Sequence, residues 1–391
     1  MAKSFYIEHL GCTRRALDAT RFTRYFIANG FERAARPDRA DYILYITCAA
    51  RKIEEDVSIR RIRELDRYNG ALIVGGCLPG INRERLREVF NGPAFTPADE
   101  DALDRIFPGM EVKLKDLPDA HVIYPRNFLE TVKNFYFVVR PSLGFLNRLW
   151  DYAGRRLVRK SYYLRIGWGC VKEHCTYCAI WPAVGELKSK PIETCLAEFR
   201  EALSSGYRHI VIVADNSGAY GQDIGADLAG LLKGLTGERG GYTIEIEDLH
   251  PYWLIRYLDR LMPVFRGGKI RLMVSGIQSG NDRILRLMNR RHNKAEAKEA
   301  FTRIMRACPG IRICTEIIAG FPSETEDEFR ETLEMIKETG FYSVSVFGYS
   351  RNPLLRDKKL LSAELSEEDI KKRIKEALEY CRANGILCSV I

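Results

Sequence analysis

Three cysteines within nine positions, Cys170, Cys175 and Cys178, have the spacing of metal ligands. They follow directly after the apolar and aromatic run YYLRIG, which is typical of a β-strand. Three thiolates are one ligand too few for a closed structural zinc site, but they leave one iron open if they hold a [4Fe-4S] cluster, and an open iron can bind a small substrate. A zinc site completed by a remote ligand such as His174, or three buried thiols, are the alternatives.

This segment resembles the signature of radical S-adenosylmethionine (SAM) enzymes, in which the free iron chelates the amino and carboxylate groups of SAM. The family pattern is C-x3-C-x2-C, whereas residues 171–174 make the first gap one residue longer here. A loop absorbs one extra residue without separating three convergent thiolates, so we retain the cluster assignment.

Three further cysteines each follow a predicted strand within the first 110 residues. Cys12 comes after SFYIEHL, Cys48 after DYILYIT and Cys77 after ALIVGG. Helical patterns lie between these runs, and such alternation is typical of a doubly wound parallel sheet. The strands of such a sheet end at one edge, about 5 Å apart, so we expect the three thiols to converge there. The alternative is three half-buried thiols, which are individually common.

From residue 160 onward, strand and helix patterns alternate six times. The predicted strands are residues 162–167, 208–214, 242–247, 270–276, 311–320 and 341–350. Six such units predict a partial (β/α)6 barrel with its chemistry at the carboxyl ends of the strands, and the triplet at Cys170 follows the first of them. A charged helix and a short apolar tail, ILCSVI, end the chain. The predicted fold class is therefore α/β, a doubly wound parallel sheet followed by this barrel.

The predicted domains are residues 1–110, a linker over 111–160, and the barrel over 161–391. Between Arg140 and Lys160 the linker carries six basic residues against the single acid Asp151, with apolar residues near one helical face. Such a stripe packs on its own domain, faces RNA or substrate, or lies on a membrane surface, and packing is the commonest of these.

The composition is that of an ordinary globular protein, with 46% hydrophobic and 29% charged residues, which excludes disordered and fibrous classes. The net charge of +9 suits an anionic partner such as RNA but fits a plain cytosolic protein almost as well. Eleven cysteines, no secretory signal and no apolar run near the ~20 residues that span a bilayer predict a soluble cytoplasmic protein that binds no membrane.

Both halves together resemble one family, the radical SAM methylthiotransferases. These enzymes insert sulfur into an unactivated C–H bond and methylate the inserted sulfur. The strings that carry the resemblance are LGCTRRALD, ITCAARKIEEDVSIRRI and VGGCLPG in the first half, and GCVKEHCTYCAIWP, ADNSGAYGQD, EDLHP, SGIQSGNDRILRLMNRR, TEIIAGFPSETEDEF and VFGYS in the second. The resemblance implies two [4Fe-4S] clusters and SAM as cofactors. Cys170, Cys175 and Cys178 would hold the cluster that binds SAM.

The resemblance further implies that Cys12, Cys48 and Cys77 hold an auxiliary cluster. Its open iron would bind sulfide or methylsulfide and deliver it to the substrate radical. One electron from an external donor of the flavodoxin or ferredoxin type would cleave SAM to a 5′-deoxyadenosyl radical, which abstracts the substrate hydrogen. The implied SAM contacts are Asp215 and Asn216 for the amino group, then Gln278, Ser279, Glu316 and Tyr349, with Tyr177 stacked on the adenine or covering the cluster. No catalytic side chain beyond the cluster ligands is assigned.

The chain also departs from the family. Arg15 stands where an asparagine usually follows the first auxiliary cysteine, and Ile46 where an asparagine usually precedes the second. The arginine-rich segment after the radical SAM triplet is reduced to VGELKSKP, and RNPLLRD replaces a glycine-threonine pair. We expect no small terminal β-barrel (TRAM) domain of the kind that ends family members modifying tRNA or a ribosomal protein.

We therefore expect a sulfur-inserting, methylthiotransferase-like enzyme that acts on a nucleoside, a peptide or another small substrate. The first alternative is the commoner family role, methylthiolation of a tRNA adenosine. Two others are a radical SAM enzyme whose second cluster only relays electrons, and a non-catalytic two-cluster electron carrier.

Overall fold

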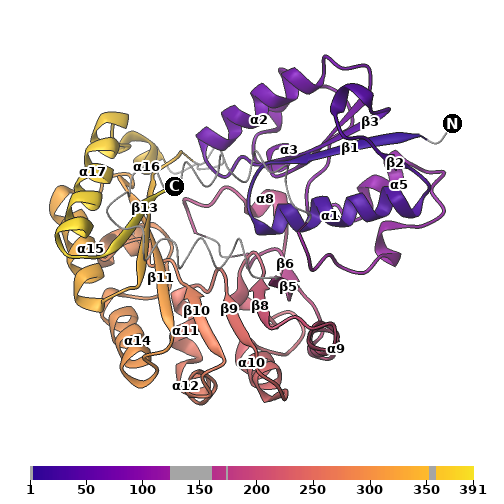
Figure 1. Ribbon diagram of the computed structural model, residues 1–391. Coiled ribbons are helices and arrows are strands. Elements are labelled where there is room, and N and C mark those ends of the chain that lie inside the picture. Colours follow the sequence, from indigo (N-terminus) through magenta and orange to yellow (C-terminus); the bar gives the residue numbers. More distant parts are fainter. Residues whose placement is uncertain (1–2, 124–160, 173–174, 352–357) are drawn as a thin grey trace.

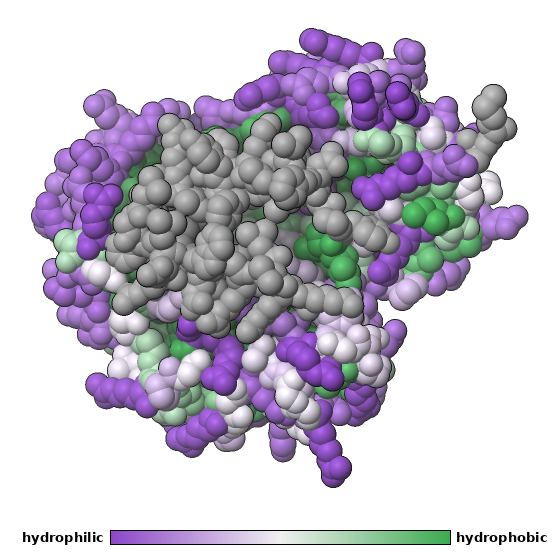
Figure 2. All heavy atoms as spheres, viewed as in Figure 1, coloured by the Kyte–Doolittle hydropathy of each residue, from purple (hydrophilic) through white to green (hydrophobic). Residues whose placement is uncertain are grey.

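The computed structural model describes residues 3–123, 161–172, 175–351 and 358–391, which form two α/β domains with parallel sheets. Figure 1 shows the amino-terminal domain above the open end of the larger, curved sheet. The predicted fold class is confirmed. Among the described residues, no helix is both long and apolar enough to cross a membrane. Hydrophilic side chains gather along the outer rim of both domains in the view of Figure 2.

The amino-terminal domain has a four-stranded parallel sheet in the order β2-β1-β3-β4. Its strands are β1 (Ser4–His9), β2 (Glu32–Arg33), β3 (Tyr42–Thr47) and β4 (Ala71–Gly76). Its helices are α1 (Thr13–Ala28), η1 (Pro37–Arg39), α2 (Lys52–Leu65), α3 (Leu78–Ile81), α4 (Arg83–Arg87), α5 (Ala102–Ile106) and η2 (Leu114–Asp116). Five of the six residues of β3 are buried, as a central strand covered on both faces requires.

The second domain has a seven-stranded parallel sheet in the order β5-β8-β9-β10-β11-β12-β13. The strands are β5 (Ser161–Arg165), β8 (His209–Val213), β9 (Thr243–Ile246), β10 (Ile270–Val274), β11 (Arg312–Ala319), β12 (Ser343–Gly348) and β13 (Leu387–Val390). An antiparallel pair, β6 (Gly167–Trp168) and β7 (Lys188–Ser189), lies beside the sheet's first strand.

Helices cover the convex side of this sheet, as Figure 1 shows. They include α9 (Ile192–Ser204), α10 (Leu228–Gly237), α12 (Leu258–Arg266), α14 (Lys294–Ala307), α15 (Glu326–Thr339) and α17 (Glu367–Ala383). The shorter helices of the domain are α8 (Trp181–Val184), η3 (Ser217–Ala219), α11 (Pro251–Arg256), α13 (Asp282–Leu287) and α16 (Lys358–Ser362).

The helix α15 illustrates how the sequence defines these elements. The Thr325 hydroxyl accepts a hydrogen bond from the Glu328 amide (3.2 Å), while the Glu328 carboxylate accepts one from the Thr325 amide (2.9 Å). This capping box satisfies amides that the first helical turn leaves unpaired, each cap being worth about 1 kcal/mol. Phe329, Leu333 and Ile336 recur at helical spacing and are fully buried against the sheet.

The apolar tail expected at the end of the chain is a seventh strand, β13, which pairs in parallel with β12. The predicted barrel of six strands is therefore one strand too small. Only Leu387 of the strand is buried, because β13 forms an edge of the sheet, and so short an edge strand has too little alternation to be recognised from sequence.

The linker is described only in part. The basic stretch between Arg140 and Lys160 lies outside the described residues. Leu114 and Leu117, beyond the predicted boundary at residue 110, pack with Phe26 in the core of the amino-terminal domain. The division into 1–110, 111–160 and 161–391 stays a prediction.

Candidate functional site

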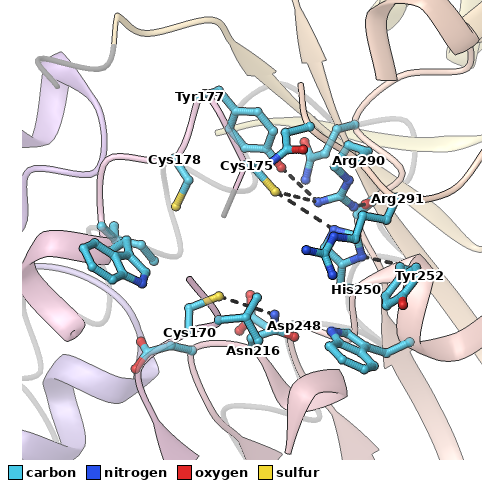
Figure 3. A pocket seen from close by; sticks show the side chains of 18 of the residues that line it. Cys170, Cys175, Tyr177, Cys178, Asn216, Asp248, His250, Tyr252, Arg290 and Arg291 are labelled. Carbon is cyan, nitrogen blue, oxygen red and sulfur yellow. Dashed lines mark hydrogen bonds between the residues drawn. The ribbon is translucent and has the colours of Figure 1, made fainter. Parts of the chain in front are cut away.

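An open cavity lies at the carboxyl ends of the barrel strands, where parallel barrels place their chemistry. Cys170, Cys175 and Cys178 form part of its wall. Figure 3 shows the three sulfur atoms around the same space, with polar side chains from later strand ends opposite them.

Short loop contacts hold the three cysteines. The Cys170 amide donates to the Gly185 carbonyl (3.1 Å), and the Cys178 amide donates to the Cys175 carbonyl (3.0 Å). Burial raises the pKa of Cys178 to about 12 and also raises that of Cys170. Buried thiols of this kind become ligands when a bound cation stabilises their thiolates.

Three thiols are donors of the kind that an iron-sulfur cluster binds. Among the described residues, no three His, Cys, Asp or Glu side chains lie close enough together to hold one metal ion. A cluster binds its three thiolates through different irons and so needs them further apart than a zinc ion does. His174, our alternative zinc ligand, lies outside the described residues.

Asp215 and Asn216 follow β8 and line the cavity, as predicted. The Asp215 carboxylate accepts a hydrogen bond from the Gly169 amide (2.9 Å), which fixes the backbone before Cys170. The Asn216 amide nitrogen donates to the Cys170 sulfur (3.4 Å). Both side chains therefore contact the cysteine loop, and their contact with SAM stays a prediction.

Gln278 and Glu316 also line the cavity, on adjacent strand ends. Gln278 adopts a left-handed backbone (φ 66°) and pairs with β11 through its amide and carbonyl. A side chain at Gly276 would come within 2.4 Å of the Gln278 side-chain nitrogen, so Gln278 would have to move. Burial, together with Asp248, raises the pKa of Glu316 to about 7, against the lowering effect of Arg14 and Arg290.

The remaining predicted SAM contacts differ in position. Tyr177 lines the cavity beside the triplet. Ser279 does not: it is buried, and its hydroxyl lies 3.4 Å from that of Thr332 on α15. Tyr349 lies outside the cavity too, packed edge-on against Phe321 with ring centroids 5.6 Å apart. The contact of Ser279 and Tyr349 with SAM stays a prediction.

Sequence reasoning missed several side chains of the cavity. Arg290 and His250 approach Cys175, at 3.5 Å and 4.0 Å from its sulfur, and Asp248 follows β9. The aromatic side chains of Trp181 and Trp253 also line the cavity. The strings EDLHP and LMNRR had marked three of these positions, but sequence alone gives no side-chain direction.

The second triplet lies at one edge of the amino-terminal sheet. Cys12, Cys48 and Cys77 follow β1, β3 and β4, which are adjacent strands. Gly11 comes so close to Cys48 that a side chain at Gly11 would meet the Cys48 Cβ at 3.2 Å, and its φ of 125° also favours glycine. Burial raises the pKa of Cys48 to about 11 and that of Cys77 to about 12, while Cys12 is exposed. The expected convergence at one sheet edge is thus present.

Two short helices bring the triplets together. Helix α3 begins immediately after Cys77, and α8 begins three residues after Cys178. The two helices pack so closely that a side chain on Gly80 would lie 2.7 Å from the Cα of Ala183. The loops that carry the two triplets are therefore in contact.

Buried ion pairs join the same two domains. Arg14, on α1, reaches Asp215 (3.1 Å) and also pairs with Asp248 at the end of β9. Asp18, one turn further along α1, pairs with Arg165 of β5 (2.7 Å). The Asp215 side chain, which is 4% exposed, thus contacts both the amino-terminal domain and the loop of Cys170.

Family models match both domains. The Radical SAM superfamily model covers residues 166–336, and the model described as Uncharacterized protein family UPF0004 covers residues 4–95.

Full-length relatives match across the two domains. The chain is 29% identical to a probable threonylcarbamoyladenosine tRNA methylthiotransferase of Pyrococcus horikoshii, over 89% of this chain and 77% of the relative. It is 30% identical to the tRNA-2-methylthio-N(6)-dimethylallyladenosine synthase of Thermotoga petrophila (88% and 74%). It is also 30% identical to the ribosomal protein uS12 methylthiotransferase RimO of Pelotomaculum thermopropionicum (95% and 84%).

Among solved structures, the radical SAM methyltransferase TsrM of Kitasatospora setae aligns with a TM-score of 0.60, over 88% of this chain and 73% of that one. Its sequence identity is 11%, so this likeness concerns the fold alone.

Proposed function

The chain belongs to the radical SAM methylthiotransferase family, and from this premise we propose that it methylthiolates a modified adenosine of tRNA. Two of the three relatives named above act on such adenosines and the third on a ribosomal protein. These relatives support our alternative hypothesis, tRNA, better than the small substrate that we expected from the sequence.

The observation that carries the proposal is the contact between the two cysteine-bearing loops through α3 and α8. A substrate carbon that has lost a hydrogen atom must react with sulfur before it reacts elsewhere. The two clusters must therefore open onto the same cavity. Gly80 against Ala183 supports this arrangement, as does the pair of Arg14 with Asp215.

The residues fit the cofactors that the family implies. Cys170, Cys175 and Cys178 would hold the cluster that binds SAM, and Cys12, Cys48 and Cys77 the second cluster. Together with SAM, these groups supply the one-electron cleavage, the sulfur and the methyl group of the reaction.

The chain's own residues position the reactants. Asp215 and Asn216 hold the Cys170 loop, and Glu316 presents a carboxyl group that a cationic ligand would keep ionised. Trp181 and Trp253 give the cavity flat apolar walls, which suit an unstacked base and exclude water.

Mass analysis of a reconstituted reaction tests the proposal. The enzyme is loaded anaerobically with iron and sulfide, reduced, and given SAM with a labelled methyl group and tRNA that lacks methylthio groups. We expect a modified adenosine in the digested tRNA to gain sulfur together with the labelled methyl. A product confined to a free nucleoside, peptide or small molecule would contradict the tRNA assignment.

Removal of the second triplet separates the remaining alternatives. The variant Cys12→Ala/Cys48→Ala/Cys77→Ala should still cleave SAM but transfer no sulfur, with Cys308→Ala, outside both triplets, as the control. Sulfur transfer that survives in the triple variant would mean that the second site does not supply the sulfur, and loss of SAM cleavage in that variant would indicate that the second site relays electrons. A wild-type protein that cleaves no SAM on reduction would instead be an electron carrier.

Salt dependence tests the partner directly. If tRNA is bound through its phosphates, its affinity should fall steeply between low and moderate salt. Salt-independent binding would contradict a role of the net positive charge in substrate binding.

A further inference from the structure

Arg290 is a buried cation beside the SAM-binding triplet. It lies in the turn between α13 and α14, and its side chain is 8% exposed. One terminal nitrogen donates to the Cys175 sulfur (3.5 Å) and to the Tyr177 hydroxyl (3.1 Å), and the other donates to the Gly276 carbonyl (2.5 Å). Figure 3 shows the guanidinium pointing at the space enclosed by the three sulfur atoms.

The Arg290 guanidinium stays charged, because arginine does not lose its proton in proteins. Glu316 is a carboxyl group whose field reaches it. The Nε of Arg290 is buried without a hydrogen-bond partner. A buried charge is retained where something pairs with it, and a Cys175 thiolate would pair with Arg290 across the donated hydrogen bond (3.5 Å).

The other groups next to Cys175 do not supply a positive charge. His250 lies 4.0 Å from the sulfur, but its Nδ1 accepts a hydrogen bond from the Tyr252 amide (3.1 Å), so the ring carries at most the proton on Nε2 and is neutral. Asn216 contacts Cys170 through an uncharged amide. Arg290 is thus the charged donor to the triplet among these neighbours.

We propose that Arg290 is a positioning residue that raises the reduction potential of the cluster held by Cys170, Cys175 and Cys178, through its charge and its N–H donation to the Cys175 sulfur. On reduction the cluster gains one electron from the external donor, which is oxidised by one electron, and no proton or bond changes place. A fixed positive charge stabilises the more negative product, and hydrogen bonds to cluster sulfurs act in the same direction.

The test is a redox titration of the loaded, full-length enzyme without substrate, followed by electron paramagnetic resonance (EPR). The signal of the cluster is identified by its change when SAM is added. In Arg290→Gln, which keeps an amide donor but loses the charge, we expect the reduced-to-oxidised ratio at a fixed potential to fall at least tenfold, about 59 mV for one electron. Arg290→Lys should shift the ratio less.

Arg291 gives the matched control. It is the next residue, also lines the cavity, and lies over the Tyr252 ring at 5.8 Å rather than against Cys175. Arg291→Gln should shift the ratio much less than Arg290→Gln. An unchanged ratio in Arg290→Gln, or an equal shift in Arg291→Gln, would overturn the inference.

A second measurement serves if Arg290→Gln fails to hold its cluster. In the wild-type enzyme grown with arginine labelled by ¹⁵N in the guanidinium, pulsed EPR of the reduced cluster should detect a coupled nitrogen. Absence of that coupling would overturn the inference. Because neither measurement includes a substrate, their failure would leave the proposed methylthiolation of tRNA untouched.

Discussion

Glu316 is a carboxyl group of the cavity whose pKa lies well above its ordinary value. It projects from β11 beside Gln278, and its pKa of about 7 arises mainly from burial, with Asp248 adding to the effect. At neutral pH about half of the ligand-free molecules therefore carry a proton there. A cationic ligand such as SAM would displace that proton when it binds.

Glu316→Gln should weaken SAM binding about tenfold, which corresponds to about 1.4 kcal/mol. In the wild type, affinity should increase as the pH rises from about 6 to about 8, because the carboxylate forms over that range. The variant should lose this dependence. Equilibrium dialysis of anaerobic protein checks both, and equal pH profiles in the two proteins would contradict the assignment.

The raised pKa of Glu316 also affects the stability of the ligand-free fold. A rise in pH lowers this stability, whereas it strengthens SAM binding. The folded state binds the Glu316 proton more tightly than the unfolded chain, whose value is 4.5. Its favourable contribution is therefore complete below about pH 4.5 and is lost as the pH rises through about 7.

At this scale the sequence predicted where the cysteines gather but not their surroundings. Cysteine spacing and strand-end position were enough to select Cys170 and Cys77 as candidate ligands, because loops at the sheet edge can bring thiols together. Strand-end position does not give the direction of a side chain, and the Ser279 hydroxyl turns toward Thr332 on α15. Arg290 could not be assigned, since a run of five basic and polar residues, 289–293, looks like solvated surface in sequence.

At the scale of elements, α3 and α8 are two four-residue helices near the site, and they join the triplets. Their packing depends on the absence of a side chain at Gly80, where a Cβ would lie 2.7 Å from the Ala183 backbone. Backbone cannot yield as a flexible side chain can, so any larger residue must push the two helices apart.

Gly80→Val should therefore uncouple sulfur transfer from SAM cleavage. We expect the methylthio product per SAM cleaved to fall at least tenfold, while the iron content stays that of the wild type. Gly237→Ala, where a Cβ meets nothing within 4 Å, is the matched control. An unchanged ratio in Gly80→Val would show that the contact of α3 with α8 is not needed.

The last helix, α17, is anchored by a buried ion pair. Arg373 lies 2.6 Å from Glu324, which precedes α15, and the exposed fractions of the two side chains are 7% and 0%. Removing one partner of such a pair leaves an uncompensated buried charge, which costs about 3 to 5 kcal/mol.

Arg373→Met should lower the free energy of unfolding by about 3 kcal/mol, measured by urea denaturation of the apoprotein. Lys375→Met breaks an exposed pair with Glu379 on the same helix and should cost less than about 1 kcal/mol. Similar losses in the two variants would mean that burial adds nothing to the Arg373 pair.

Most elements of the sheets could be predicted because their strands are long apolar runs bounded by helices with clear caps. Strand β13 could not, since a four-residue edge strand has only one buried side chain to mark it. Helix α1 begins at Thr13, directly after Cys12, which takes the N-cap position without a side-chain hydrogen bond.

At the scale of the whole molecule, the two domains are fixed by buried charges as well as by apolar contact. Arg165 of β5 pairs with Asp18 of α1 and donates to the Arg14 carbonyl (2.7 Å), with 4% of its side chain exposed. Sequence could not reveal this docking, since the partners lie 147 positions apart.

Arg165→Met should loosen the domains while leaving each one folded. We expect hydrogen exchange to rise in α1 and β5, and thermal unfolding to separate into two transitions. Arg200→Met, which breaks the more exposed pair with Glu238, should change neither. A single transition in Arg165→Met would mean that the apolar contacts alone hold the domains together.

The shared space between the two triplets is tested most directly by EPR of the fully reduced enzyme. Two clusters bound on touching loops should show magnetic coupling, with broadened and fast-relaxing signals, in protein carrying about eight irons per chain. The coupling should vanish in Cys12→Ala/Cys48→Ala/Cys77→Ala, which retains about four irons. Two independent, narrow signals in the wild type would contradict the account, because sulfur could not then reach the substrate carbon from the second site.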